Sequence, residues 1–167
     1  METTQWLRET RLLDFASPPI AALIQDRGWR RLEGEARVRA AYEFVRDEIS
    51  FGYNAADDLP ASRVLADGYG QCNTKGTLFM ALLRALGVPC RLHGFTIDKR
   101  LQRGAVTGVF YLLAPREILH SWIEARLHDR WLNLEGFILD LPYLSALQAR
   151  FACAGAFCGY GVATDDF

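Results

Sequence analysis

The sequence has no long apolar run, and neither sign of charge is in excess. Its longest apolar run, at residues 109–114, is far shorter than the roughly 20 residues that a membrane-spanning helix needs. There are 19 basic and 20 acidic residues and the net charge is −1, so the composition supports neither a nucleic-acid partner nor a membrane surface. The first ten residues carry charges where a signal peptide would need an apolar stretch, and we therefore expect a cytoplasmic protein.

Cysteine is scarce as well, and its spacing excludes two common kinds of site. None of the four cysteines forms a Cys-x-x-Cys motif, so a zinc ribbon or a thioredoxin-type redox site is not supported. Cys153 and Cys158 lie in a tail rich in glycine and alanine, where we expect plain burial rather than a metal site or a disulfide. No EF-hand-type calcium loop is visible, and we expect neither a metal nor a cofactor.

The size and composition of the chain suit one globular domain. Half of the 167 residues are hydrophobic, which is enough for a sizeable core, and no internal repeat divides the chain. We predict a single domain over residues 1–167, with its core at about 35–140 and a C-terminal extension at 141–167.

The first 70 residues have the pattern of helices joined by short loops. Three helices are predicted there: one that starts at Ser17-Pro18 and ends at Gly28, one over about 35–49, and one over 61–66. They are interpreted as packing elements. The loop at 51–59 carries the adjacent carboxylates Asp57 and Asp58, which we interpret as solvated.

A fourth helix follows a glycine-rich turn that delivers Cys72 to its first residues. Apolar residues recur at helical spacing from Leu78 to Leu86, Gly87 suits the left-handed position after a helix, and Pro89 prevents continuation. A helix start presents free N–H groups and the positive end of the helix dipole, which favours a thiolate. Cys72 is therefore a candidate nucleophile; the alternative is a buried structural cysteine.

After this helix the apolar pattern changes to that of strands. Strands are predicted at 91–97, 105–113, 120–127 and 131–135, with a tight turn at 128–130 and a short helix at 142–150. Helices followed by a run of strands indicate an α+β fold, in which N-terminal helices and the nucleophile-bearing helix pack against an antiparallel β-sheet.

A cysteine nucleophile needs an imidazole and a group that orients it. Of the three histidines, His128 falls in the predicted turn and His93 inside a strand, whereas His120 begins a strand, where a side chain can meet a helix end. The next strand returns Glu135 toward the same end of the hairpin, so its carboxylate could accept a hydrogen bond from the His120 imidazole. The alternative is an ordinary cross-strand surface pair.

Several motifs together resemble the transglutaminase-like superfamily of papain-like cysteine enzymes. They cover roughly residues 40–140 and comprise Gly-Tyr-Gly-Gln-Cys at 68–72, the helix and Val-Pro-Cys-Arg at 78–91, His-Ser-Trp-Ile-Glu at 120–124, and Trp-Leu-Asn-Leu-Glu at 131–135. The segment at 42–51 is also similar. The order of Cys, then His on a strand, then an acid on the next strand matches that of the family.

The resemblance implies a triad of Cys72 as nucleophile, His120 as general acid and base, and Glu135 as the group that orients the histidine. The family usually has Asp at the third position, so Asn133 and Asp140 are kept as alternatives. The backbone N–H of Cys72 is one implied oxyanion donor, and Gln71 or Tyr69 would support the second.

The implied activity is attack on an amide bond of a peptide, a protein or a small molecule, through an acyl-thioester on Cys72. Hydrolysis, as a peptidase or deamidase, is the expected reaction. Transfer to an amine, as in a transglutaminase or a biosynthetic acyltransferase, and a non-catalytic binding module on the same fold are the alternatives.

Overall fold

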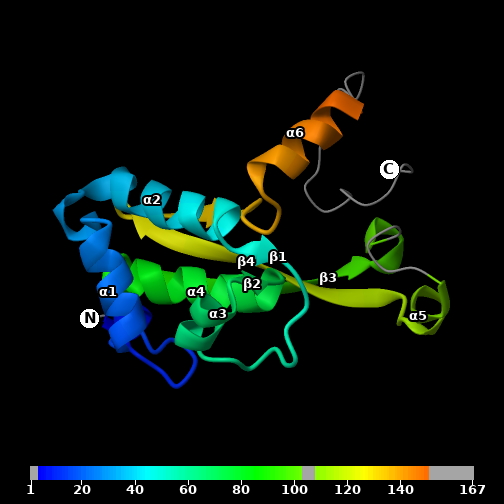
Figure 1. The fold of residues 1–167 in the computed structure, drawn as a ribbon, viewed down its shortest axis with the longest axis horizontal. Coiled ribbons are helices and arrows are strands. Elements are labelled where there is room, and N and C mark those ends of the chain that lie inside the picture. The colour runs from blue at the N-terminus through cyan, green and yellow to red at the C-terminus, as the bar shows by residue number, and fades with distance from the viewer. Residues whose placement is uncertain (1–3, 103–107, 151–167) are drawn as a thin grey trace. The chain divides into compact units, whose positions relative to one another are not determined.

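The computed structural model describes residues 4–102 and 108–150 (Figure 1). Contacts divide the chain into two compact units, and each is described by itself. The first unit contains Met1–His93 and Ser121–Leu141, and the second contains Gly94–His120 and Pro142–Phe167. That the whole chain is a single domain stays a prediction.

The helices of the first unit begin and end close to where the sequence predicts. They are α1 (Pro18–Asp26), α2 (Gly34–Asp47), α3 (Ala61–Asp67) and α4 (Cys72–Ala85), with single 3-10 turns at Thr4–Leu7 and Trp29–Arg31. Gly28 and Gly87 follow α1 and α4 with φ of 65° and 76°, a conformation that glycine adopts at little steric cost. The predicted helix boundaries are confirmed, with Cys72 as the first residue of α4.

The main sheet has three strands in the order β3–β4–β5: β3 (Cys90–Asp98), β4 (Glu117–Leu127) and β5 (Arg130–Leu134). β4 and β5 are antiparallel, with Ile123 opposite Leu134. The turn between them places His128 and Asp129 at φ of 48° and 63°, as tight hairpin turns require. A second sheet was not predicted: β1 (Ser50–Phe51) and β2 (Tyr69–Gly70) form a short parallel pair directly before α4.

The core of the first unit forms between α4 and one face of the sheet. An added Cβ on Gly76 would lie 3.5 Å from Ile123 Cδ1, so the helix backbone comes close to β4. The Phe79 ring packs between those of Tyr42 on α2, at 5.9 Å, and Phe137, at 5.3 Å. Apolar burial here, at about 25 cal/mol per Å², fixes α4 and therefore the position of Cys72. The α+β prediction is confirmed (Figure 1).

The second unit contains the one clear error among the predicted elements. Residues 105–113 were predicted to be a buried strand. Residues 105–107 lie outside the described residues, and Gly108–Leu113 is a helix, α5, with Leu112 and Leu113 exposed at 76% and 79%. This unit also holds a 3-10 turn at Lys99–Gln102. Helix α6, Leu141–Arg150, agrees with the helix predicted at 142–150. No helix among the described residues is long and apolar enough to cross a membrane.

Candidate active site around Cys72

The chain enters α4 through a set of hydrogen bonds that fixes its first turn. The Gln71 backbone N–H donates to Thr74 Oγ1 at 2.9 Å, and the Thr74 hydroxyl donates to Asn54 Oδ1 at 2.7 Å. Gly70 leaves room for this arrangement, because an added Cβ would lie 2.7 Å from Thr74 Oγ1. Thr74 thereby joins Gln71, directly before Cys72, to Asn54 in the loop after β1, and the first turn of α4 is held in place.

Two amide side chains flank the Cys72 sulfur, and one carboxylate holds both of them. The sulfur lies 3.9 Å from Gln71 Oε1 and 3.7 Å from Asn73 Oδ1. The nitrogen of each amide donates to Asp57, from Gln71 Nε2 and, at 3.3 Å, from Asn73 Nδ2. The buried Ser121 hydroxyl of β4 donates to Asn73 Oδ1 at 3.0 Å. Asp57 was interpreted as solvated; it is exposed, and in addition it belongs to the nucleophile's surroundings.

The surroundings of Cys72 raise the pKa of its thiol, contrary to the expectation from the helix start. Burial is the largest cause, and the negative charge of Asp57 acts in the same direction. Hydrogen bonds from the backbone N–H groups of Asn73 and Cys72 and from the Ser121 hydroxyl lower the pKa, as the helix position predicts, but they do not prevail. The sulfur therefore needs a proton acceptor before it can act as a nucleophile at neutral pH.

The other predicted catalytic residues are found at two places. His120 is 7% exposed and belongs to the second unit, where its ring meets that of Phe95 edge-on at 5.2 Å. Glu135 belongs to the first unit, where it is exposed directly after β5, and its backbone carbonyl accepts a hydrogen bond from the Tyr42 hydroxyl at 2.7 Å. The joining of Cys72, His120 and Glu135 into a triad stays a prediction.

The remaining candidates have contacts of their own. Asn133 Oδ1 accepts a hydrogen bond from Trp122 Nε1 at 3.2 Å. Asp140 favours the charged form of the buried Lys75. The ring of Tyr69 covers Gly52, since an added Cβ there would lie 3.0 Å from its Cδ2.

Lys75 is a site residue that the sequence reasoning missed. It is fully buried one turn into α4, and its ammonium donates to the carbonyls of Ile49 at 2.7 Å, Ile138 at 2.8 Å and Arg46 at 3.3 Å. Burial lowers its pKa to about 8. Its position one turn before Leu78 and Phe79, on the apolar stripe, is the signal that could have identified it.

No group of three His, Cys, Asp or Glu side chains within residues 4–102 and 108–150 could hold a metal ion. Cys90 is fully buried, and burial raises the pKa of its thiol to about 11. Cys153 and Cys158 lie outside the described residues.

Comparison with known proteins agrees with the motifs of this site. One similar solved structure is described as a putative cysteine protease from Cytophaga hutchinsonii; it has 16% identity and a TM-score of 0.60, over 83% of this chain. The alignment covers 43% of that protein's length, and at this identity the likeness concerns the fold alone. The comparison with curated proteins gave no match. Residues 24–136, which make up well over half of the chain, match the model of the transglutaminase-like superfamily, so this chain belongs to that superfamily.

Proposed function

We propose that this protein is a cysteine enzyme of the transglutaminase type that hydrolyses amide bonds through an acyl-thioester on Cys72. The observation that carries the proposal is the position of Cys72 as the first residue of α4, with backbone N–H groups directed at its sulfur. Such donors can also stabilise the oxyanion of a tetrahedral intermediate, and one of them contributes about 3 kcal/mol in other enzymes.

His120 is the proposed proton acceptor. Its support is the sequence motif: His120 begins His-Ser-Trp-Ile-Glu at 120–124, within the stretch that matches the family model, and follows Cys72 in the order that the family has. The raised pKa of the thiol makes such a base necessary, because the other described groups leave the sulfur protonated. Glu135 is proposed to orient the imidazole, and Gln71 or Tyr69 to support the second oxyanion donor.

In the proposed reaction the Cys72 proton passes to His120, and the thiolate attacks the amide carbonyl. The tetrahedral intermediate collapses, the C–N bond breaks, and the imidazolium gives its proton to the leaving amine. Water then attacks the thioester while His120 takes a proton from it, and the thiol is restored as the acid leaves. An amine in place of water would make the reaction a transfer.

The test is the pH dependence of Cys72 alkylation, followed by mass spectrometry in the parent protein, in His120→Ala and in His128→Ala. His128 is exposed in the β4–β5 turn and serves as the matched control. An apparent thiol pKa that is higher in His120→Ala than in the parent and in His128→Ala supports the pair. An equal profile in all three proteins contradicts it and favours a binding module.

The acceptor is tested separately by incubating the protein with a panel of peptide and small amides, with and without a primary amine. Release of ammonia or amine with formation of the free acid supports hydrolysis. Products that contain the added amine, without the acid, would instead show an acyltransferase. Both activities should disappear in Cys72→Ala.

A further inference from the structure

Asp57 is an exposed carboxylate beside the nucleophile, and the donors that it binds among the described residues are neutral amides. The amides of Gln71 and Asn73 donate to its two oxygens, and no Lys, Arg or His of the described residues lies within 4 Å of them. Neighbouring acids differ: Asp58 pairs with Arg11 at 3.3 Å, and Asp67 pairs with Arg63 at 2.8 Å. Within the part of the chain that the structure describes, no nearby basic side chain balances the negative charge of Asp57.

An unbalanced carboxylate at this place works against the nucleophile. The charge of Asp57 raises the pKa of the Cys72 thiol and so disfavours the thiolate that the reaction needs. A cation that arrives with the substrate would offset this charge at the moment of attack. The same carboxylate also holds both amides that flank the sulfur, so a cation bound there would lie beside the reacting atoms.

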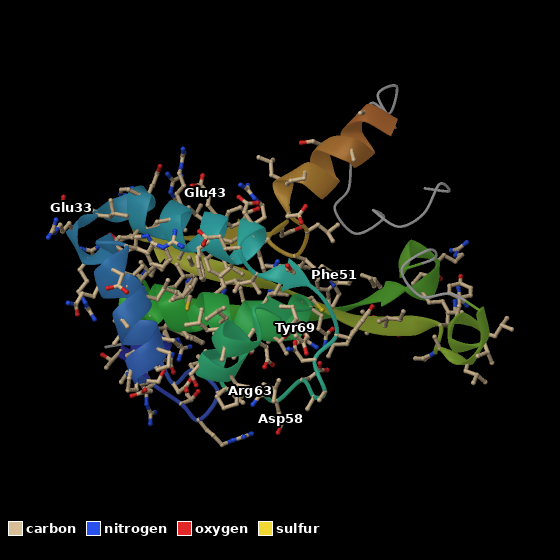
Figure 2. The ribbon with its side chains drawn as sticks, viewed as in Figure 1. Glu33, Glu43, Phe51, Asp58, Arg63 and Tyr69 are labelled. Carbon is tan, nitrogen blue, oxygen red and sulfur yellow. The ribbon has the colours of Figure 1, made fainter. Side chains whose placement is uncertain are left out.

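Two exposed aromatic rings lie where β1 ends and the loop that carries Asp57 begins. Phe51 and Tyr53 are 43% and 57% exposed, and their rings meet edge-on with centroids 5.6 Å apart. Tyr53 lies close enough to Cys72 for the sulfur's charge to contribute to the raised pKa of its hydroxyl, after burial. Figure 2 labels Phe51 on β1, Tyr69 on β2 and Asp58 on the loop that follows β1. Aromatic faces attract cations and pack well against the methylene stems of lysine and arginine.

We propose that the Cys72 site selects acyl donors that carry a lysyl- or arginyl-type side chain next to the reacting carbonyl. The Asp57 carboxylate is the counter-charge for the cationic head group of that side chain. The rings of Phe51 and Tyr53 pack against its methylene groups. This inference rests on the proposed function and names the substrate class of the same site. A bound cation also removes the charge that opposes ionisation of Cys72, so the correct substrate helps to activate the nucleophile.

The charge preference is tested first with thiol reagents, which need no turnover. The Cys72 thiolate attacks the sulfenyl sulfur of a methanethiosulfonate, an S–S bond forms, and methanesulfinate leaves. Rates are measured for the cationic 2-aminoethyl, the anionic 2-sulfonatoethyl and the neutral methyl reagents, each divided by the rate with 2-mercaptoethanol. The proteins are the parent, Asp57→Asn, Asp57→Glu and the matched control Asp58→Asn, read at the Cys72 peptide by mass spectrometry.

We expect the parent, Asp57→Glu and Asp58→Asn to prefer the cationic over the anionic reagent by about tenfold, the difference that one unit charge about 6 Å away in water makes between reagents of opposite charge. Asp57→Asn should lose this preference and, because its thiol ionises more easily, react faster with the neutral reagent at pH 7. A preference that is equal in Asp57→Asn and Asp58→Asn overturns the inference. A purely structural role of Asp57 would not increase the neutral rate.

The second experiment compares hydrolysis of Nα-acetyl-lysine and Nα-acetyl-norleucine 4-nitroanilides, which differ in the terminal ammonium. The lysyl substrate should have the higher kcat/KM in the parent and lose most of that advantage in Asp57→Asn. Turnover with no lysyl advantage overturns the inference and leaves the proposed function intact. No turnover of either amide, together with a clear reagent preference, contradicts the proposed hydrolysis while the cation preference stands.

Discussion

At the scale of single residues, Ser121 is the described side chain whose hydrogen bond lowers the pKa of the Cys72 thiol. Its hydroxyl lies on β4 and is 3% exposed, so water cannot easily replace it. Ser121→Ala should raise the thiol pKa further. The alkylation rate of Cys72 at pH 7 should fall about fivefold, the effect of one hydrogen bond of about 1 kcal/mol.

The control is Ser62→Ala, which removes a hydroxyl that bonds Asp14 away from the site. Both variants delete the same atoms from a serine, and only Ser121→Ala should change the pH midpoint of alkylation. An unchanged midpoint in Ser121→Ala would show that its hydroxyl serves Asn73 alone.

The third member of the triad is also a question for single residues. Asn133 accepts a hydrogen bond from Trp122, and Asp140 acts on Lys75; Glu135 is the residue proposed to orient His120. Glu135→Gln should lower kcat for amide hydrolysis by about a hundredfold or more with little change in KM, as loss of a triad carboxylate does elsewhere.

Asn133→Ala and Asp140→Asn are the matched comparisons, measured by steady-state kinetics under the same conditions. Each should retain at least a tenth of the parent's kcat. A greater loss in either of them than in Glu135→Gln would transfer the role to that residue.

Sequence reasoning predicted Cys72 as the nucleophile but could not separate Asp57 from Asp58. Both are aspartates in one loop, and no periodicity applies to them. Their difference arises because the loop folds over the start of α4, which brings Asp57 to two amides and leaves Asp58 with Arg11 at the surface. Such a contact depends on the path of the loop, which spacing alone does not determine.

At the scale of elements, the start of α4 depends on the lack of a side chain at Gly70. A methyl group there would lie 2.7 Å from Thr74 Oγ1 and 3.2 Å from the Lys75 backbone nitrogen. Gly70→Ala should therefore lower the free energy of unfolding by about 1–3 kcal/mol and reduce the reactivity of Cys72, since the first helical turn must move. Urea denaturation and alkylation at pH 7 measure the two effects.

Gly94→Ala on β3 is the control for this substitution. Its nearest neighbour to an added Cβ is Leu119 Cδ1 at 4.0 Å, and its φ is not positive, so stability and Cys72 reactivity should stay close to those of the parent. If Gly70→Ala were equally harmless, the turn before α4 would be more adaptable than the close contacts indicate.

The elements themselves were largely predictable because their signals are local. Neighbouring residues determine the helix starts, the glycine after α4 and the alternation of β4. The strand prediction failed at residues 108–113 because valine, phenylalanine and tyrosine favour strands only where a pleated, half-buried surface exists. Here Gly108, at φ of 61°, opens a helix whose Leu112 and Leu113 are exposed.

At the scale of the whole molecule, Lys75 joins segments that are distant in the sequence. Its ammonium binds the carbonyls of Arg46 in the last turn of α2, of Ile49 after that helix and of Ile138 beyond β5, while its backbone belongs to α4. All three of its N–H donors are used, and the segment that follows Glu135 is held to the helix that bears Cys72. A single sequence shows only that one lysine lies on an apolar stripe.

Lys75 should therefore be visible in the pH dependence of stability. Its pKa is about 8 in the folded chain and 10.5 as a model value, so between these pH values the unfolded chain binds more protons than the folded one. The free energy of unfolding should consequently rise with pH in this window, by up to about 3 kcal/mol for a shift of this size. The charged form carries the full desolvation cost below pH 8, and that cost is relieved as the pH increases.

Lys75→Met keeps the stem and removes the charge, so the difference in unfolding free energy, parent minus variant, isolates this group. Other groups that titrate at alkaline pH, such as Cys90, occur in both proteins and largely cancel. The difference should become more favourable to the parent from pH 8 to 10.5. If the unfolding free energies of the parent and of Lys75→Met changed in parallel with pH, the three carbonyls would stabilise the ammonium as well as water does. Desolvation would then not oppose its burial.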